Sequence, residues 1–495
     1  MTAAAGERRY RLDPLDRSGV FLGLTLAALV VLGGAGVVSA VAVSVGAPLV
    51  VAAVPVAAGA GLAWGRVARV AVLEWVAVLA GYARRGRVWR VPLSLVDPSR
   101  PAGDPGVAVP ACLEGLSLVG VDGPEGVLGV VVDDRAGTLS ALVPVRGREF
   151  VLLARDDQER LLAGWGDVMA GFAAETGEVA RLSWSSLAAP AGAGEHLAWV
   201  DSQPGAGEPG GAHGAYRQLL AVAGAMATSH EVLVTVTVNR RRARRSNARG
   251  DVAGQAGAGA LVKAVGALTR SVTAAGLDPG VPLGPVGVAD AIGARADPTG
   301  VPPGTAAVSL AARVGLAPAV PTRPMAVRAE WSRVGVDAAW HRVYWVAEWP
   351  RLEQHPDWFE PVLAWTGSVC REVTVIVEPV APSAARRRID RDTVRLASDA
   401  DTASGRGRRV TGWDRRALQA VAEREAELVA GYAEIAYAGL VRVTAGDEDT
   451  LGEGCEQLEH LAREHGVELR CLYGRQDAAW AASLPLGLGL ARTLT

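Results

Sequence analysis

The chain has 495 residues, half of them hydrophobic, and a formal net charge of −2. This length allows several buried cores, and the near-neutral charge gives no electrostatic argument for nucleic acid as the main partner. A single lysine, Lys263, accompanies many arginines, a usage typical of GC-rich actinobacterial coding.

The N-terminal region contains a long uncharged stretch. Residues 18–65 include no Asp, Glu, Lys, Arg or His over 48 positions. As one helix this stretch would be about 72 Å long, more than twice the roughly 30 Å hydrocarbon core of a bilayer. We therefore predict a transmembrane hairpin over 18–65, with helices at about 20–39 and 48–64. The run is also far longer than the apolar region of a cleavable signal peptide, which favours an anchor.

Arginines flank this hairpin on both sides, whereas its connecting turn has no charge. By the positive-inside tendency, residues 1–17 form a cytoplasmic basic head and the large C-terminal region is cytoplasmic too. The expected location is the plasma membrane, with two spans. Residues 66–91 predict an interfacial helix, although a first soluble helix packed on the next domain fits as well. The expected membrane-interface residues are Arg17, Trp64, Arg66, Arg69 and Trp75.

The remaining sequence predicts an α+β fold with two domains. After a linker at 92–110, a first domain covers 111–310 and a second covers 311–495. Each contains apolar alternating strands and amphipathic helices, in an order that fits ferredoxin-like strand–helix–strand units. The expected strands are 116–121, 127–133, 138–145, 179–184, 231–239, 342–349, 371–380, 435–444 and 467–472. The segments expected to be loops or charged connections are 188–214, 278–304 and 386–409.

No catalytic pattern occurs in the sequence. Lys263 lacks the glycines and the following Ser or Thr of a phosphate-binding loop, and the seven histidines form no HExxH or HxH motif. There is no GxSxG elbow, and the four cysteines form no CxxC pair, as expected for small buried thiols in a reducing compartment. We therefore predict no catalytic residue, no metal and no cofactor, and a protein that is not an enzyme.

Two surface features are candidates for partner binding. The basic run Arg240, Arg241, Arg242, Arg244, Arg245 and Arg249 could contact lipid headgroups or phosphates, but a solvated loop after a strand is the commoner role of such a run. Trp345, Trp349 and Trp358 could anchor a partner if exposed, and would otherwise belong to the core.

Several short motifs along the chain resemble one family. They are Arg9-Tyr10-Arg11, Leu15-Asp16-Arg17-Ser18-Gly19-Val20, Arg328-Ala329-Glu330-Trp331, Trp340 to Pro350, Leu472-Tyr473-Gly474-Arg475-Gln476-Asp477 and Leu484-Pro485-Leu486-Gly487. In this order the chain resembles a family of actinobacterial membrane proteins of conjugation or type IV secretion-like loci. The hairpin is similar to the small PrgI-like subunit of conjugation machines. The soluble part is similar to the non-catalytic N-terminal region of their assembly ATPases, and the chain stops where an ATPase domain would begin.

This resemblance implies a membrane-anchored scaffold that docks a separate P-loop ATPase, with no catalytic residues to carry over. The implied partners are the lipid bilayer, a conjugation-type ATPase and other membrane subunits; homo-oligomerisation and direct nucleic-acid binding stay open. Two alternatives remain at this stage. One is a type VII secretion subunit resembling the EccE class, and the other is a membrane-tethered enzyme with an unrecognised site.

Overall fold

The computed structural model describes most of the chain, and it has the α+β composition expected from the sequence. The described residues are 26–67, 70–90, 110–147, 150–173, 177–190, 194–203, 212–226, 228–246, 255–298, 324, 326–350, 355, 357–363, 369–405 and 412–489. Within them, thirteen strands form one sheet in which all neighbouring strands are antiparallel. Eleven of these strands follow the order β3-β10-β11-β12-β14-β13-β7-β8-β6-β5-β4, while β15 pairs with β12 and β9 with β6.

The first half of the sheet belongs to one unit of the chain. Its strands are β4 (Leu116–Gly123), β5 (Gly126–Asp133), β6 (Thr138–Arg146), β7 (Val179–Pro190), β8 (Thr228–Asn239) and β9 (Asp278–Pro279). Its helices are α4 (Arg155–Gly171), α5 (Gly194–Asp201), α6 (Ala212–Met226), α7 (Arg240–Ser246), α8 (Gln255–Ala274) and α9 (Pro285–Ala296), and short 3-10 turns lie at Ala111–Leu113 and Phe150–Leu152.

A second unit supplies the other half. Its strands are β10 (Ala326–Ala329), β11 (Val334–Val336), β12 (Ala339–Glu348), β13 (Cys370–Pro379), β14 (Ile435–Ala445) and β15 (Glu468–Cys471). Its helices are α11 (Glu360–Leu363), α12 (Pro382–Gly405), α13 (Gly412–Val429), α14 (Glu448–Glu464) and α15 (Gln476–Ser483).

The two units share one strand plan. In the chain, each unit contains a strand–helix–strand–strand–helix–strand run. In the sheet, the four strands of each run lie in the order fourth, first, third, second, which is β9-β6-β8-β7 in the first unit and β15-β12-β14-β13 in the second. The two second strands, β7 and β13, pair antiparallel with each other, with Ser185 opposite Thr374. The pairing of equivalent strands relates the units by an approximate two-fold axis and makes their sheets continuous.

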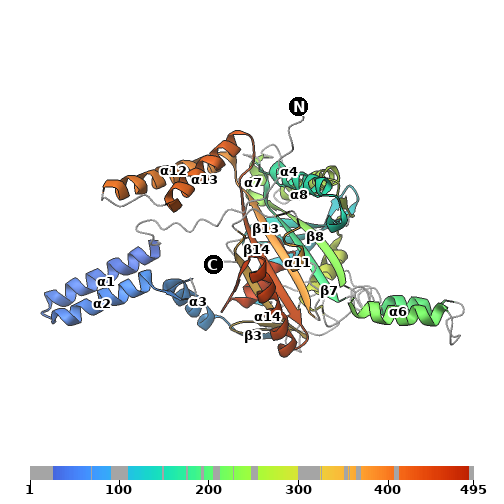
Figure 1. Cartoon of the computed structure of the whole chain (residues 1–495), viewed down its shortest axis with the longest axis horizontal. Coiled ribbons are helices and arrows are strands. Elements are labelled where there is room, and N and C mark those ends of the chain that lie inside the picture. The colour runs from blue at the N-terminus through green and yellow to red at the C-terminus, as the bar shows by residue number, and fades with distance from the viewer. Residues whose placement is uncertain are drawn as a thin grey trace.

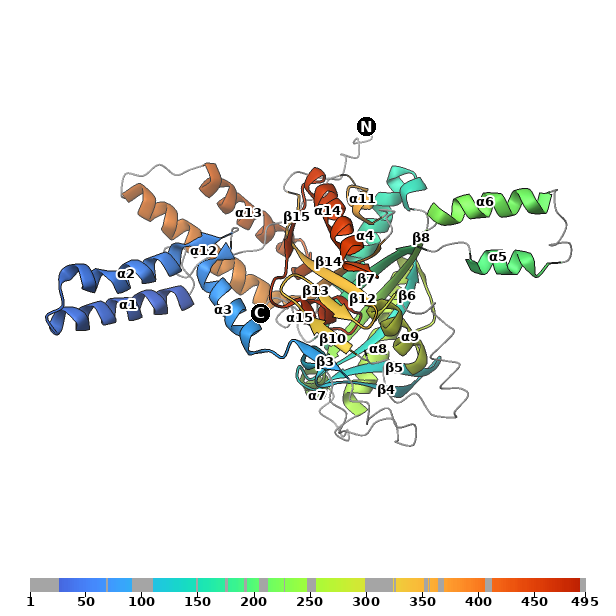
Figure 2. The same ribbon diagram turned by 90° about the horizontal axis from the view of Figure 1, so that it is seen from below.

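Three helical hairpins extend from this sheet (Figure 1). The first is formed by α1 (Leu26–Ser44) and α2 (Leu49–Trp64), and the others are α5/α6 and α12/α13. The last two are inserted at the same point of their units, between the second and third strands. Figure 2 shows α1/α2 and α12/α13 on one side of the sheet and α5/α6 on the other.

The α1/α2 pair packs through small residues. A Cβ added at Gly59 would lie 2.6 Å from the Cβ of Ala35, so glycine is what allows the two backbones to come this close. The Ser39 hydroxyl donates a hydrogen bond to the carbonyl oxygen of Ala52. Of the described helices, α1 alone is long and apolar enough to cross a membrane, over Ala27–Ser44, since α2 has 16 residues. The first helix ends at Ser44 rather than near residue 39 as predicted, because the apolar run continues without a break.

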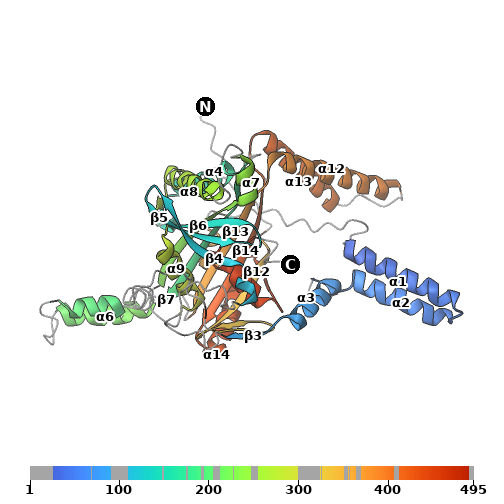
Figure 3. The same cartoon turned by 180° about the vertical axis from the view of Figure 1, so that it is seen from behind.

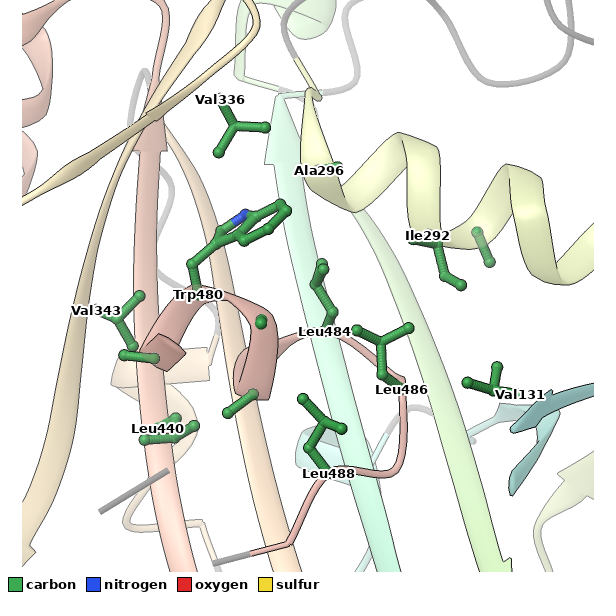
Figure 4. Close-up of a cluster of buried hydrophobic side chains, with 14 of the residues drawn as sticks. Val131, Ile292, Ala296, Val336, Val343, Leu440, Trp480, Leu484, Leu486 and Leu488 are labelled. Carbon is green, nitrogen blue, oxygen red and sulfur yellow. The ribbon is translucent and has the colours of Figure 1, made fainter. Parts of the chain in front are cut away.

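One face of the sheet is covered by α9, α15 and the residues that follow α15 (Figure 4). Trp480, Leu484, Leu486 and Leu488 point into a core that includes Ile292 of α9. Burying a large apolar side chain of this kind stabilises the fold by about 1.5–3 kcal/mol.

The terminal segment 476–488 joins the two units. The Gln476 side chain accepts a hydrogen bond from the backbone N–H of Val343 at 2.8 Å and donates one to the carbonyl oxygen of the same residue at 3.1 Å. Further along, Gly487 has φ of +69°, and a Cβ there would lie 2.1 Å from the hydroxyl oxygen of Ser140 in β6. The segment therefore runs from the second unit into the first, and its motif residues are core residues.

Several segments predicted as irregular are helical. Helix α5 lies within 188–214, α9 within 278–304, and α12 occupies most of 386–409. In α9 the proline at the first helical position, Pro285, begins the helix rather than breaking it.

The segment 66–91 is also not one helix. Residues Arg66–Val67 (β1) and Val70–Ala71 (β2) form a small hairpin, and Val72–Arg84 forms α3. Val88–Arg90 (β3) then pairs with β10, so this segment ends as an edge strand of the large sheet.

Candidate functional site

The junction between α3 and the sheet is formed by aromatic side chains. The rings of Trp75 and Trp331 stack with centroids 6.1 Å apart, and Tyr473 stacks on Trp331 at 6.0 Å. Tyr82 meets Trp331 edge-on at 5.2 Å. Each aromatic pair adds about 0.5–1.5 kcal/mol beyond the buried area, so α3 is held firmly on the second unit. We call Trp75, Tyr82, Trp331 and Tyr473 the junction cluster.

The local sequence explains how these rings are oriented. Trp75, Val78 and Tyr82 are spaced three and four residues apart and therefore lie on one face of α3. Gly474 follows Tyr473 with φ of +71°, and its N–H donates to the carbonyl oxygen of Trp331 at 2.7 Å. A Cβ at Gly474 would lie 2.7 Å from the Trp331 ring, so only glycine permits this close approach.

A cavity of about 420 Å³ lies beside the junction cluster, between α3, α14 and β15. The Tyr344 hydroxyl donates to Glu459 at 2.8 Å at its floor. Burial raises the pKa of Tyr344, and the nearby Cys455 raises it further, so this phenol stays neutral. The charged residues at the cavity are three acids and three bases: Glu74, Glu459, Glu468, Arg463, Arg470 and Arg475. Their balance gives the cavity no net preference for an ion of one sign.

A buried ionic network connects the two units on the α9 face of the sheet. Glu372 of β13 accepts hydrogen bonds from Arg295 of α9, at 2.9 Å, and from Arg442 of β14. All three side chains are at most 1% exposed. Arg295 also pairs with the half-exposed Glu231 of β8 at 2.8 Å. Burial lowers the pKa of Arg442, while the Glu372 carboxylate opposes that shift.

His341 lies fully buried beside this network. Its Nδ1 is 2.8 Å from the Thr444 hydroxyl. Desolvation, and secondarily the charge of Arg442, hold the pKa of His341 well below its usual value, so this imidazole is neutral in the fold.

The predicted arginine run is helical at its start, not a loop. Asn239 caps α7: its side-chain oxygen accepts from the N–H groups of Arg241 and Arg242, at 2.9 and 3.2 Å. Arg240 pairs with Asp134 at 2.9 Å. The exposed members of the run are Arg241, Arg242 and Arg244; Arg249 and the side chain of Arg245 lie outside the described residues.

The three candidate tryptophan anchors are partly buried. Trp349 contacts Trp358, Phe359 and Tyr437, with ring centroids 5.8–6.1 Å apart. Trp345 packs against the core formed around Trp480. All three side chains therefore contribute to packing in this chain.

The predicted membrane-interface residues are separated by the structure. Trp64 and Arg66 are exposed at the end of α2, whereas Trp75 belongs to the junction cluster. Arg17 and Arg69 lie outside the described residues. The packing of Trp75 agrees with the alternative stated above, a first helix docked on the next domain.

No sequence pattern predicts that Trp331 meets Tyr473, or that the buried ionic residues meet one another, because these residues are far apart in the chain. Within the described ranges, no group of three or more His, Cys, Asp or Glu side chains is arranged to hold a metal ion. Comparison of the sequence with protein-family models and with curated proteins found no match.

Proposed function

We propose that this chain is a membrane-anchored scaffold subunit of a conjugation or type IV secretion-like translocation apparatus, which docks a separate P-loop ATPase. The observation that carries the proposal is the junction cluster. It joins an apolar helix pair to a large two-unit body through a packed helix, so force or position at the membrane is transmitted to the body.

In this proposal both α1 and α2 span the cytoplasmic membrane. Their 19 and 16 residues correspond to about 28 and 24 Å of helix, close to the roughly 30 Å hydrocarbon core. By the positive-inside tendency, the flanking arginines favour a cytoplasmic location for both ends and an outside location for the turn near Val45 and Gly46.

We further propose that each unit of the body is ferredoxin-like. The strand order fourth-first-third-second with antiparallel neighbours, repeated in both units, supports this assignment. The resemblance to the N-terminal part of assembly ATPases rests on Gln476 and the Leu484–Gly487 motif, and both are packing residues here. This favours a shared architecture, in which the partner chain supplies the motor and this chain the support.

Membrane topology provides the first test. Val45 is 81% exposed at the tip of the hairpin, and Val45→Cys introduces a thiol there. We expect an impermeant maleimide to label this variant in intact cells, while Val394→Cys, 70% exposed on α12, stays unlabelled until the cells are opened. Labelling of both, or of Val394→Cys alone, would contradict the proposed topology.

Affinity purification provides the second test. The tagged chain, extracted from its native host in mild detergent, should bring down a P-loop ATPase identified by mass spectrometry. An unrelated two-span membrane protein with the same tag serves as control. Repeated recovery of the chain alone would refute the docking role, and recovery with type VII secretion proteins would assign it to that machinery instead.

A further inference from the structure

An apolar groove crosses the face of the sheet that carries α4, α8 and α14. Two adjoining cavities of about 260 and 210 Å³ share Trp165, Trp184 and Val234 in their walls. The second extends over β13 and β14 to Trp349, Val375 and Tyr437. None of the described residues that line the two cavities carries a charge, so the groove suits an apolar occupant.

The two units differ in the described part of one connection beside the groove. In the first unit 32 residues link β6 to β7, and they include the 17-residue helix α4. In the second unit 21 residues link β12 to β13, and the described part holds only the four-residue helix α11. Helix α4 packs on its unit through Trp165 and Val168. Among the described residues of the second unit, no helix equivalent to α4 lies in this connection.

The same chain also carries an apolar helix, α6, whose apolar side chains are exposed in the single chain. Helix α6 has 15 residues and Arg217 as its one Arg, Lys, Asp or Glu, which pairs with Asp201 at 2.8 Å. Tyr216, Leu219 and Val222 lie within about 120° of one another around the helix axis. They are 43%, 62% and 66% exposed. An apolar surface of this kind on a projecting arm is typical of a binding element.

Helix α6 is directed away from the groove of its own chain. The α5/α6 arm leaves the sheet at Pro190 and Thr228, the far ends of β7 and β8, and extends outward in every view (Figures 1–3). We infer that α6 of one copy binds in the groove of a second copy of this chain. Each copy then offers one arm and one groove, a head-to-tail contact that forms a ring where the rotation closes.

Two variants, one on α6 and one in the groove, test this inference in the full chain in detergent. Leu219→Glu with Val222→Glu places charges on α6, and Val375→Glu places one in the partly exposed groove wall. The control is Val394→Glu on the equivalent arm α12, where the side chain is 70% exposed. Light scattering coupled to size-exclusion chromatography should show the wild type and the control as oligomers. For each test variant, the dissociation constant for self-association should be raised about 30-fold or more.

Mixing the two test variants separates docking from misfolding. The groove variant keeps an intact arm and the arm variant keeps an intact groove, so the mixture should form a dimer and nothing larger. The inference is overturned if wild type is a monomer, if the arm variant still assembles, or if the mixture gives no dimer. It is equally overturned if Val375→Glu releases a co-purified foreign protein while self-association persists.

Discussion

Glu372 offers the most direct test of how the two units are held together. It contacts Arg295 from the first unit and Arg442 from the second, and all three side chains are buried. Glu372→Ala would leave two guanidinium groups without their shared carboxylate in a low-dielectric interior. Removing one partner of a buried ion pair costs about 3–5 kcal/mol, because the remaining charge is uncompensated.

The chain contains a matched control for this experiment. Glu330 also contacts two arginines, Arg328 at 2.8 Å and Arg333 at 2.7 Å, but near the surface, where its side chain is 23% exposed. Because exposed pairs contribute about 0–1 kcal/mol, Glu330→Ala should change the free energy of unfolding by no more than that. The two substitutions remove the same group from similar partners, and they differ in burial.

The assay is urea unfolding of the full chain in detergent micelles, followed by tryptophan fluorescence and circular dichroism. We expect Glu372→Ala to lower the free energy of unfolding by about 3 kcal/mol more than Glu330→Ala. Equal effects of the two substitutions would refute the claim that the buried network holds the units together.

Three further predictions follow from single residues. Gly487→Ala should lower the free energy of unfolding by about 2–4 kcal/mol in urea titrations, because the new Cβ is strained in the left-handed conformation and collides with Ser140. Gly259→Ala on α8, where the new Cβ meets open space, should be neutral or stabilising. The pKa of His341 is lowered in the fold and about 6.5 in the unfolded chain, so the unfolded chain binds the proton more readily. Below pH 6.5 the free energy of unfolding should therefore fall with decreasing pH, by up to about 1.4 kcal/mol per pH unit. In His341→Gln, urea titrations over this pH range should give a shallower slope. Burial raises the pKa of the Cys471 thiol to about 12. Alkylation of this thiol at pH 8, measured by mass spectrometry, should therefore be roughly a hundredfold slower in the folded protein than in urea. Equal rates would contradict the burial of Cys471.

The sequence predicted those elements whose signal is local. The predicted strands 116–121, 127–133 and 138–145 lie within β4, β5 and β6. Gly137, at φ of +66°, lies in the turn between the last two. Asp156 and Asp157 in the first turn of α4 are a local signal of the same kind, because acidic side chains favour the N-terminus of a helix. In each case neighbouring residues alone determine the structure.

Other elements depend on contacts that no local pattern contains. Helix α12 has a charged sequence and packs against α13, so its helical structure depends on a partner helix rather than on a local pattern. The capping Asn239 was the available signal for α7, since a side-chain oxygen before a run of good helix formers marks an N-terminus. The junction cluster joins residues 75, 331 and 473, and only the sheet topology brings them together.

Because β7 precedes β13 in the chain, β7 is synthesised well before the strand that pairs with it. Ser185 and Thr374, opposite each other in the sheet, are 189 positions apart in the chain. At a synthesis rate of about 5–20 residues per second, the ribosome takes about 10–40 s to supply β13 after β7. Throughout that interval the first unit exposes an open strand edge to other nascent chains. Pro190 at the end of β7 disfavours pairing with a foreign strand, because proline has no backbone N–H to donate.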